Sequence, residues 1–176
     1  MSNLKKTIAA LALAASPFMA VPAHAADPAQ IAKDLQCLVG SWKGAGTMTM
    51  ADGKVANVQL TYDCKSAAGG SGVACHLRMT GIPGLPAYEL DDLYGYNSGD
   101  GLVHWFTITN TGETHDHKGG LDGNTFTGLY EGPQDGKLFQ EQVSIQFVND
   151  KKVRIRSTCK LGDKLLEQAD VTATKS

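Results

Sequence analysis

The chain has 176 residues and a formal net charge of −2, and its 42% hydrophobic and 19% charged residues are typical of a folded protein rather than a disordered one. Its densest basic patch is Lys151, Lys152, Arg154 and Arg156, which is typical of the solvated face of a strand. The composition therefore gives no indication of nucleic-acid binding.

Residues 1–25 are predicted to be a bacterial secretory signal peptide. Lys5 and Lys6 precede an apolar run over 8–15, and Ala23-His24-Ala25 matches a small-x-small cleavage site. The apolar run is too short to span a membrane. The leader holds two of the 16 basic residues and none of the 18 acidic ones, so the remaining chain would carry a net charge of −4. We expect a periplasmic or secreted protein with one domain over residues 26–176 and no transmembrane segment.

The four cysteines all follow the predicted cleavage site, and an even number in an exported chain predicts two disulfides. Three connectivities exist for Cys37, Cys64, Cys75 and Cys159. We favour Cys64–Cys75, which would clip one hairpin, together with Cys37–Cys159, which would tie the N-terminal segment to a late strand. No CxxC pair is present, so the spacing does not match a structural zinc site.

A short helix is predicted over residues 28–38, where Ile31, Leu35 and Leu38 recur at helical spacing. Asp27 can cap it and Pro28 suits its first turn, and Gly40 ends it. We expect this helix to lie across one end of the fold.

The rest of the chain predicts about ten short strands, with a turn about every 8–12 residues. A strand begins near Trp42 and is interrupted by Gly44 and Gly46, which permit a bend or a close approach to a neighbour. The hairpin 102–120 supplies two strands, and the others are expected at 54–66, 73–80, 88–97, 125–131, 137–148, 152–160 and 164–174. An all-β antiparallel up-and-down barrel of 8–10 strands buries the edges of such a meander best and can leave room for one small ligand, with a two-sheet sandwich as the alternative.

The hairpin 102–120 carries three of the four histidines that follow the leader: His104, His115 and His117. If Thr111-Gly112 forms a two-residue turn, all three imidazoles share one face with Glu113. If the turn has three residues, the pairing slips by one, and His115 and His117 join Thr107 and Trp105, away from His104. The sequence does not decide between the two turns.

The histidines suggest a metal site, and the aromatic residues suggest a pocket. Imidazoles at His104, His115 and His117 suit a divalent metal such as zinc, and three nitrogen ligands with an open position form a known catalytic geometry. Packing in the core or at the barrel rim explains the same histidines and aromatic residues. The residues that we predict to line a ligand pocket are Trp105, Phe106, Tyr94, Tyr96 and Tyr130.

No catalytic pattern accompanies these sites. Asp91 and Asp92 are adjacent in a strand and so point to opposite sides, and the chain contains neither a Gly-x-Ser-x-Gly elbow nor a phosphate-binding loop. We do not predict an enzyme, and catalysis would depend on the histidine cluster.

The segment LVGSWKGAG, with Leu38, Gly40, Trp42, Gly44 and Gly46, resembles the opening of a bacterial family of unknown function with lipocalin-like barrels. The outline from Leu38 to Thr174 is similar to the wider calycin group of lipocalins, fatty-acid-binding proteins and nitrobindin-like haem barrels. The resemblance implies an up-and-down barrel with the N-terminal segment at its closed end. Nitrobindin-like barrels hold haem through a late histidine, and no histidine follows His117, so haem is not expected.

Three functions follow as hypotheses. The first is a binding module that holds a small, mostly apolar molecule in the barrel. The second is a metal-binding or metal-dependent protein that uses the histidines of the hairpin 102–120. The third is a structural or interaction protein of the cell envelope without a small ligand.

Overall fold

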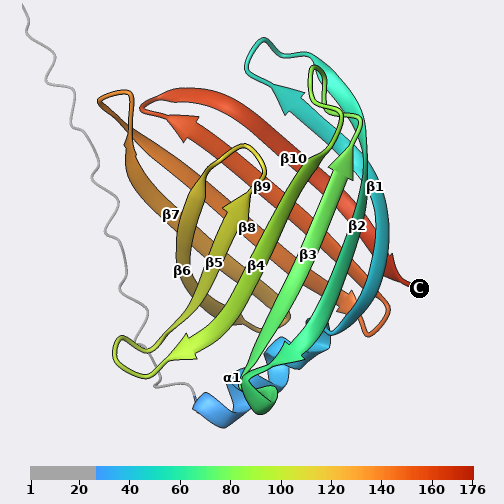
Figure 1. Ribbon diagram of the computed structural model, residues 1–176, viewed down its shortest axis with the longest axis vertical. Coiled ribbons are helices and arrows are strands. Elements are labelled where there is room, and N and C mark those ends of the chain that lie inside the picture. Colours follow the sequence, from blue (N-terminus) through green and yellow to red (C-terminus); the bar gives the residue numbers. More distant parts are fainter. Residues whose placement is uncertain (1–26) are drawn as a thin grey trace, which may run out of the picture.

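The computed structural model describes residues 27–176, so the predicted signal peptide at 1–25 lies outside the described residues. Ten antiparallel strands close into one barrel, with a short helix at one end (Figure 1). The strands are β1 (Gly40–Met50), β2 (Val55–Ala67), β3 (Gly72–Thr80), β4 (Tyr88–Asn97), β5 (Leu102–Thr109), β6 (Thr114–Asp122), β7 (Thr125–Gln134), β8 (Lys137–Asn149), β9 (Lys152–Leu161) and β10 (Lys164–Lys175).

Each strand pairs with its neighbours in sequence, and β1 pairs with β10 to complete the ring. The prediction of an up-and-down barrel is confirmed, and the sandwich is wrong. The close pairing of β1 with β10 explains why β1 contains glycines, because a Cβ added at Gly46 would lie 2.0 Å from the Asp170 carbonyl oxygen. Only glycine lets β1 approach β10 this closely.

Helix α1 (Pro28–Leu35) continues into a 3₁₀ turn (Gln36–Leu38), as the apolar spacing predicts. The side chain of Asp27 caps it by accepting a hydrogen bond of 3.0 Å from the Ala29 backbone N–H. Its buried face, with Ile31, Leu35 and Leu38, packs over β3 and β4 at one end of the barrel. Among the described residues, no helix is both long enough and apolar enough to cross a membrane.

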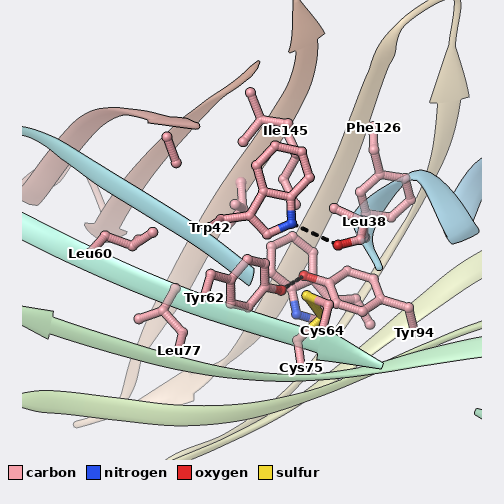
Figure 2. Packing of buried hydrophobic residues seen from close by; sticks show 14 of the residues in the cluster. Leu38, Trp42, Leu60, Tyr62, Cys64, Cys75, Leu77, Tyr94, Phe126 and Ile145 are labelled. Carbon is pink, nitrogen blue, oxygen red and sulfur yellow. Dashed lines mark hydrogen bonds between the residues drawn. A yellow bond between two sulfur atoms is a disulfide. The ribbon is translucent and has the colours of Figure 1, made fainter. Parts of the chain in front are cut away.

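The half of the barrel beneath α1 is filled by large side chains. Trp42, Tyr62, Tyr94 and Phe126 are each at most 2% exposed, and they pack together around Leu38 (Figure 2). The indole N–H of Trp42 donates a hydrogen bond of 2.7 Å to the Leu38 carbonyl. This bond ties the barrel wall to the cap, so α1 marks the closed end.

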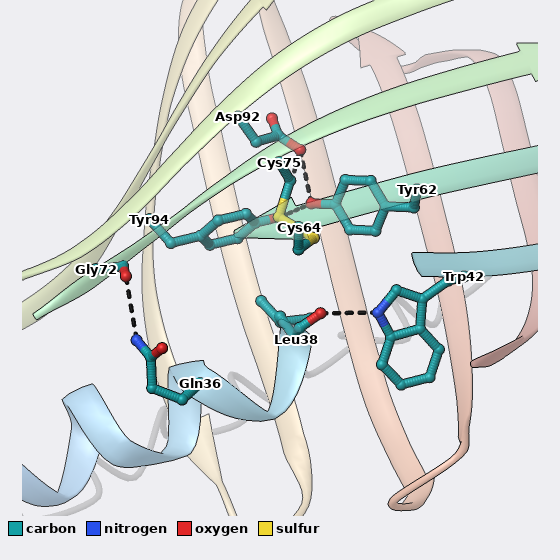
Figure 3. The surroundings of a disulfide bond; sticks show 9 residues. All are labelled: Gln36, Leu38, Trp42, Tyr62, Cys64, Gly72, Cys75, Asp92 and Tyr94. Carbon is teal, nitrogen blue, oxygen red and sulfur yellow. Dashed lines mark hydrogen bonds between the residues drawn. A yellow bond between two sulfur atoms is a disulfide. The ribbon is translucent and has the colours of Figure 1, made fainter. Parts of the chain in front are cut away.

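One of the two predicted disulfides forms. Cys64 and Cys75 are paired residues on β2 and β3, and their bond closes this hairpin inside the barrel (Figure 3). The predicted Cys37–Cys159 bond is wrong, because both cysteines are free within residues 27–176. Cys37 is exposed on the 3₁₀ turn at the closed end, whereas Cys159 is buried near the far end of β9.

A candidate site in the open half of the barrel

The end of the barrel opposite α1 contains a cavity of about 330 Å³. Exposed residues at the ends of strands and in turns, including Thr111, Glu113 and Gln134, lie at its rim, so the cavity reaches the solvent there. Most of its wall is apolar and comes from every side of the ring, including Met48, Leu60, Leu77, Met79, Leu90, Val143, Ile155 and Val171.

The hairpin between β5 and β6 has the three-residue turn. The Thr109 backbone N–H donates to the Glu113 carbonyl at 3.0 Å, and Gly112 has a φ of +90°. Asn110 does not pair with Glu113, because its backbone N–H donates to the Glu89 carbonyl at 2.9 Å. Thr107 therefore pairs with His115, and Trp105 with His117, with these side chains facing the barrel interior.

His104 is on the outer face of β5, so the structure does not bring it together with His115 and His117 as the predicted metal set requires. Its Nε2 lies 2.8 Å from Asp100, and its Nδ1 lies 3.0 Å from Asp116. The hydrogen bond to Asp100 raises the pKa of His104 most, and Asp116 adds to the effect. His104 belongs to a surface cluster of a histidine with two carboxylates.

Glu141 on β8 takes the place that the sequence pattern assigned to His104. His115 Nδ1 lies 2.7 Å from Glu141 Oε2, and His117 Nε2 lies 3.1 Å from the same oxygen. One potential ligand atom from each of the three residues lies within 4.8 Å of the others. The His115 ring stacks on Tyr130 at 4.1 Å, which fixes its plane.

The surroundings keep Glu141 ionised. Burial alone would raise the pKa of its carboxyl, but the hydrogen bonds and charges of His115 and His117 outweigh this effect and lower the pKa to about 2. The cluster thus combines one carboxylate with two imidazoles on the wall of an otherwise apolar cavity. This set of donors suits a polar group of a ligand or a metal ion.

A second carboxyl, that of Asp92, lies deeper in the barrel. It accepts a hydrogen bond from Thr107 at 2.6 Å. It also accepts one from Tyr62 at 2.8 Å, and the Tyr94 hydroxyl lies 3.4 Å away (Figure 3). Desolvation raises the pKa of Asp92 to about 6, although the hydroxyl donors oppose this shift. The Asp92 network forms the polar part of the cavity floor.

The predicted pocket residues are only partly in place. Trp105 lines the cavity, and Tyr130 packs against His115 beside it. Tyr94 belongs to the core beneath the cavity, and Tyr96 is half-buried where it packs against that core. Phe106 is 43% exposed on the outer face, because it neighbours the inward Trp105 along one strand.

The site predicted from the sequence includes neither Asp92 nor Glu141, although the sequence contains a signal for both. Glu141 interrupts the alternating apolar set Phe139, Val143, Ile145 and Phe147. Asp92 does the same among the aromatic residues of β4. A lone carboxylate on an inward face has to find partners inside the barrel, so it marks a polar site.

No family model matches the chain, and no curated protein matches it in sequence. Among solved structures, the chain is similar to the S-type phycobiliprotein lyase CPES from Guillardia theta. The TM-score is 0.53 and the identity 13%, over 82% of this chain and 91% of the lyase. At this identity the likeness concerns the fold, which is a calycin-like barrel.

Proposed function

We propose that this protein is an exported binding module that holds a small, mostly apolar molecule with one polar group in the open half of its barrel. The observation that carries the proposal is the cavity of about 330 Å³, which is lined by aliphatic side chains and by two clusters of convergent polar groups. Cavities of this size and composition are typical of small-molecule sites.

The polar groups would orient the molecule. Glu141 with its two histidines lies on one wall, and Asp92 lies on the floor. An apolar body would contact Leu60, Leu77 and their neighbours while its polar group reached one of these clusters. The predicted leader and the Cys64–Cys75 disulfide support export, because disulfides persist in oxidising compartments.

The similarity to a phycobiliprotein lyase supports a barrel that works on or with another molecule rather than a purely structural one. Under the third hypothesis, a structural protein, we would expect side chains to fill the interior of the barrel. The partly empty barrel is what favours the binding module.

The test is to titrate the untagged protein with 1-N-phenylnaphthylamine, a neutral apolar dye that fluoresces when shielded from water. Ala169 is buried on the cavity wall, so Ala169→Phe places a ring inside the cavity. We expect one dye per parent chain and at least about tenfold weaker binding in the variant, equivalent to about 1.4 kcal/mol.

Gln168→Phe is the matched control, because Gln168 is the preceding residue of β10 and is exposed. It adds the same ring on the outside and should leave dye binding unchanged. Circular dichroism verifies that both variants are folded. Equal dye binding by both variants, or an absence of dye binding in the parent, would contradict the proposal.

A further inference from the structure

We infer that His115, His117 and Glu141 form a site for a single divalent transition-metal ion, such as zinc, inside the barrel cavity. This inference goes beyond the proposed binding of an apolar molecule. It also replaces the histidine set expected from the sequence, because the third ligand comes from β8 rather than from β5.

The ligand chemistry supports an ion of this type. Two imidazoles and one carboxylate form the protein ligand set of several zinc enzymes, with further positions left for water or substrate. All three residues line the cavity, so an open position of the ion would face the space available to a ligand.

The surroundings are pre-arranged for a cation. His117 is 2% exposed, and its Nε2 is the ring nitrogen that faces Glu141. A nitrogen of each histidine lies within hydrogen-bond distance of the same Glu141 oxygen, so the three potential ligand atoms already point toward one another. An ion bound between them would contact each nitrogen and the carboxylate directly.

The backbone also leaves room at this point. Strand β7 lies between β6 and β8, and its inward position beside His117 is Gly128. A Cβ at Gly128 would lie 3.2 Å from His117 Cβ and 3.4 Å from Trp105 Cε3. The imidazole of His117 therefore depends on this glycine for its place on the wall.

The experiment starts from untagged protein produced with its own leader and stripped of metal with a chelator. Zinc is titrated by calorimetry. Cobalt is added in a separate experiment, because the visible absorption of bound Co²⁺ reports how many nitrogen and oxygen ligands surround the ion. We expect one ion per chain. Glu141→Gln keeps the shape of the side chain but removes its charge, and His117→Ala removes a ligand, and each should weaken zinc binding by about 100-fold or more.

His104→Gln is the matched control, because His104 lies between Asp100 and Asp116 at the surface and offers the same ligand types. It should bind zinc as the parent does. A parent that takes up no zinc, or a Glu141→Gln variant that binds as tightly as the parent, would overturn the inference. Loss of binding in His104→Gln would also overturn it, since the ion would then lie at the surface.

The metal site and the apolar cavity can fail separately. Ala169→Phe should lose the dye and keep zinc, since the three zinc ligands are on β6 and β8 and Ala169 is on β10. Zinc binding without dye binding would leave the metal site standing and contradict the binding module. Dye binding without zinc binding would support the binding module and contradict the metal site.

Discussion

At the scale of single residues, Asp92 makes the stability of the barrel depend on pH in an unusual direction. Burial raises the pKa of its carboxyl from 3.8 to about 6. Between those values the folded chain keeps a proton that the unfolded chain has lost. The free energy of unfolding therefore falls as the pH rises from about 4 to about 6.

Asp92→Asn removes this titration. We expect the free energy of unfolding of the parent, relative to the variant, to fall by up to about 3 kcal/mol between pH 4 and pH 6 and then level off. Urea unfolding of the parent and of Asp92→Asn at several pH values measures this difference in the free energy of unfolding. Thr107→Val removes a donor that opposes the rise in pKa, so its profile should level off at a higher pH than that of the parent. Parallel profiles of the parent and Asp92→Asn would contradict this account.

Some residues of the site follow from the sequence and some do not. Alternation places Trp105 and Phe106 on opposite faces, but both faces of β5 carry large apolar side chains, so the pattern alone does not tell which face is inward. Glu141 is different, because a charge among the alternating apolar residues of β8 is by itself a sign of an interior polar site.

At the scale of elements, most strands and turns could be predicted, because the turns contain Gly, Asp and Asn between alternating segments. The turn after β5 could not be assigned, since its length depends on bonds from Asn110 to Ala87 and Glu89, near the start of β4. β7 runs on to Gln134, beyond the predicted end at Glu131, because Gly132 and Pro133 still pair with β8.

The β2–β3 hairpin owes part of its stability to its disulfide. The Cys64–Cys75 bond closes a segment with a sequence separation of 11. Replacing both cysteines with alanine should lower the free energy of unfolding by about 2–3 kcal/mol, because the unfolded chain gains freedom. Chemical denaturation measures the loss, and Cys37→Ser, at an exposed free thiol, should change stability by less than about 0.5 kcal/mol. A double variant as stable as the parent would show that the bond contributes nothing.

At the scale of the whole molecule, the barrel separates a packed closed end from an open end with the candidate site. Leu35, on the buried face of α1 at the end away from the cavity, is 5% exposed. Leu35→Ala should lower the free energy of unfolding by about 2–4 kcal/mol because it leaves a hole in the cap. Dye binding should change by less than about threefold, which the same fluorescence titration measures. A large loss of dye binding in a folded Leu35→Ala variant would show that the two ends are coupled.

The turn at Asn110–Gly112 also has an evolutionary consequence. Deleting one residue there would shift the pairing of β6 by one and invert its faces, so His115 and His117 would point to the solvent on the side of His104. A single-codon deletion would thus convert an interior pair of histidines into a surface pair on the side of Asp100, would turn Asp116 inward, and an insertion of the same size would reverse both changes. Turn length would then act as a heritable switch that decides on which side of the wall this chain presents its histidines.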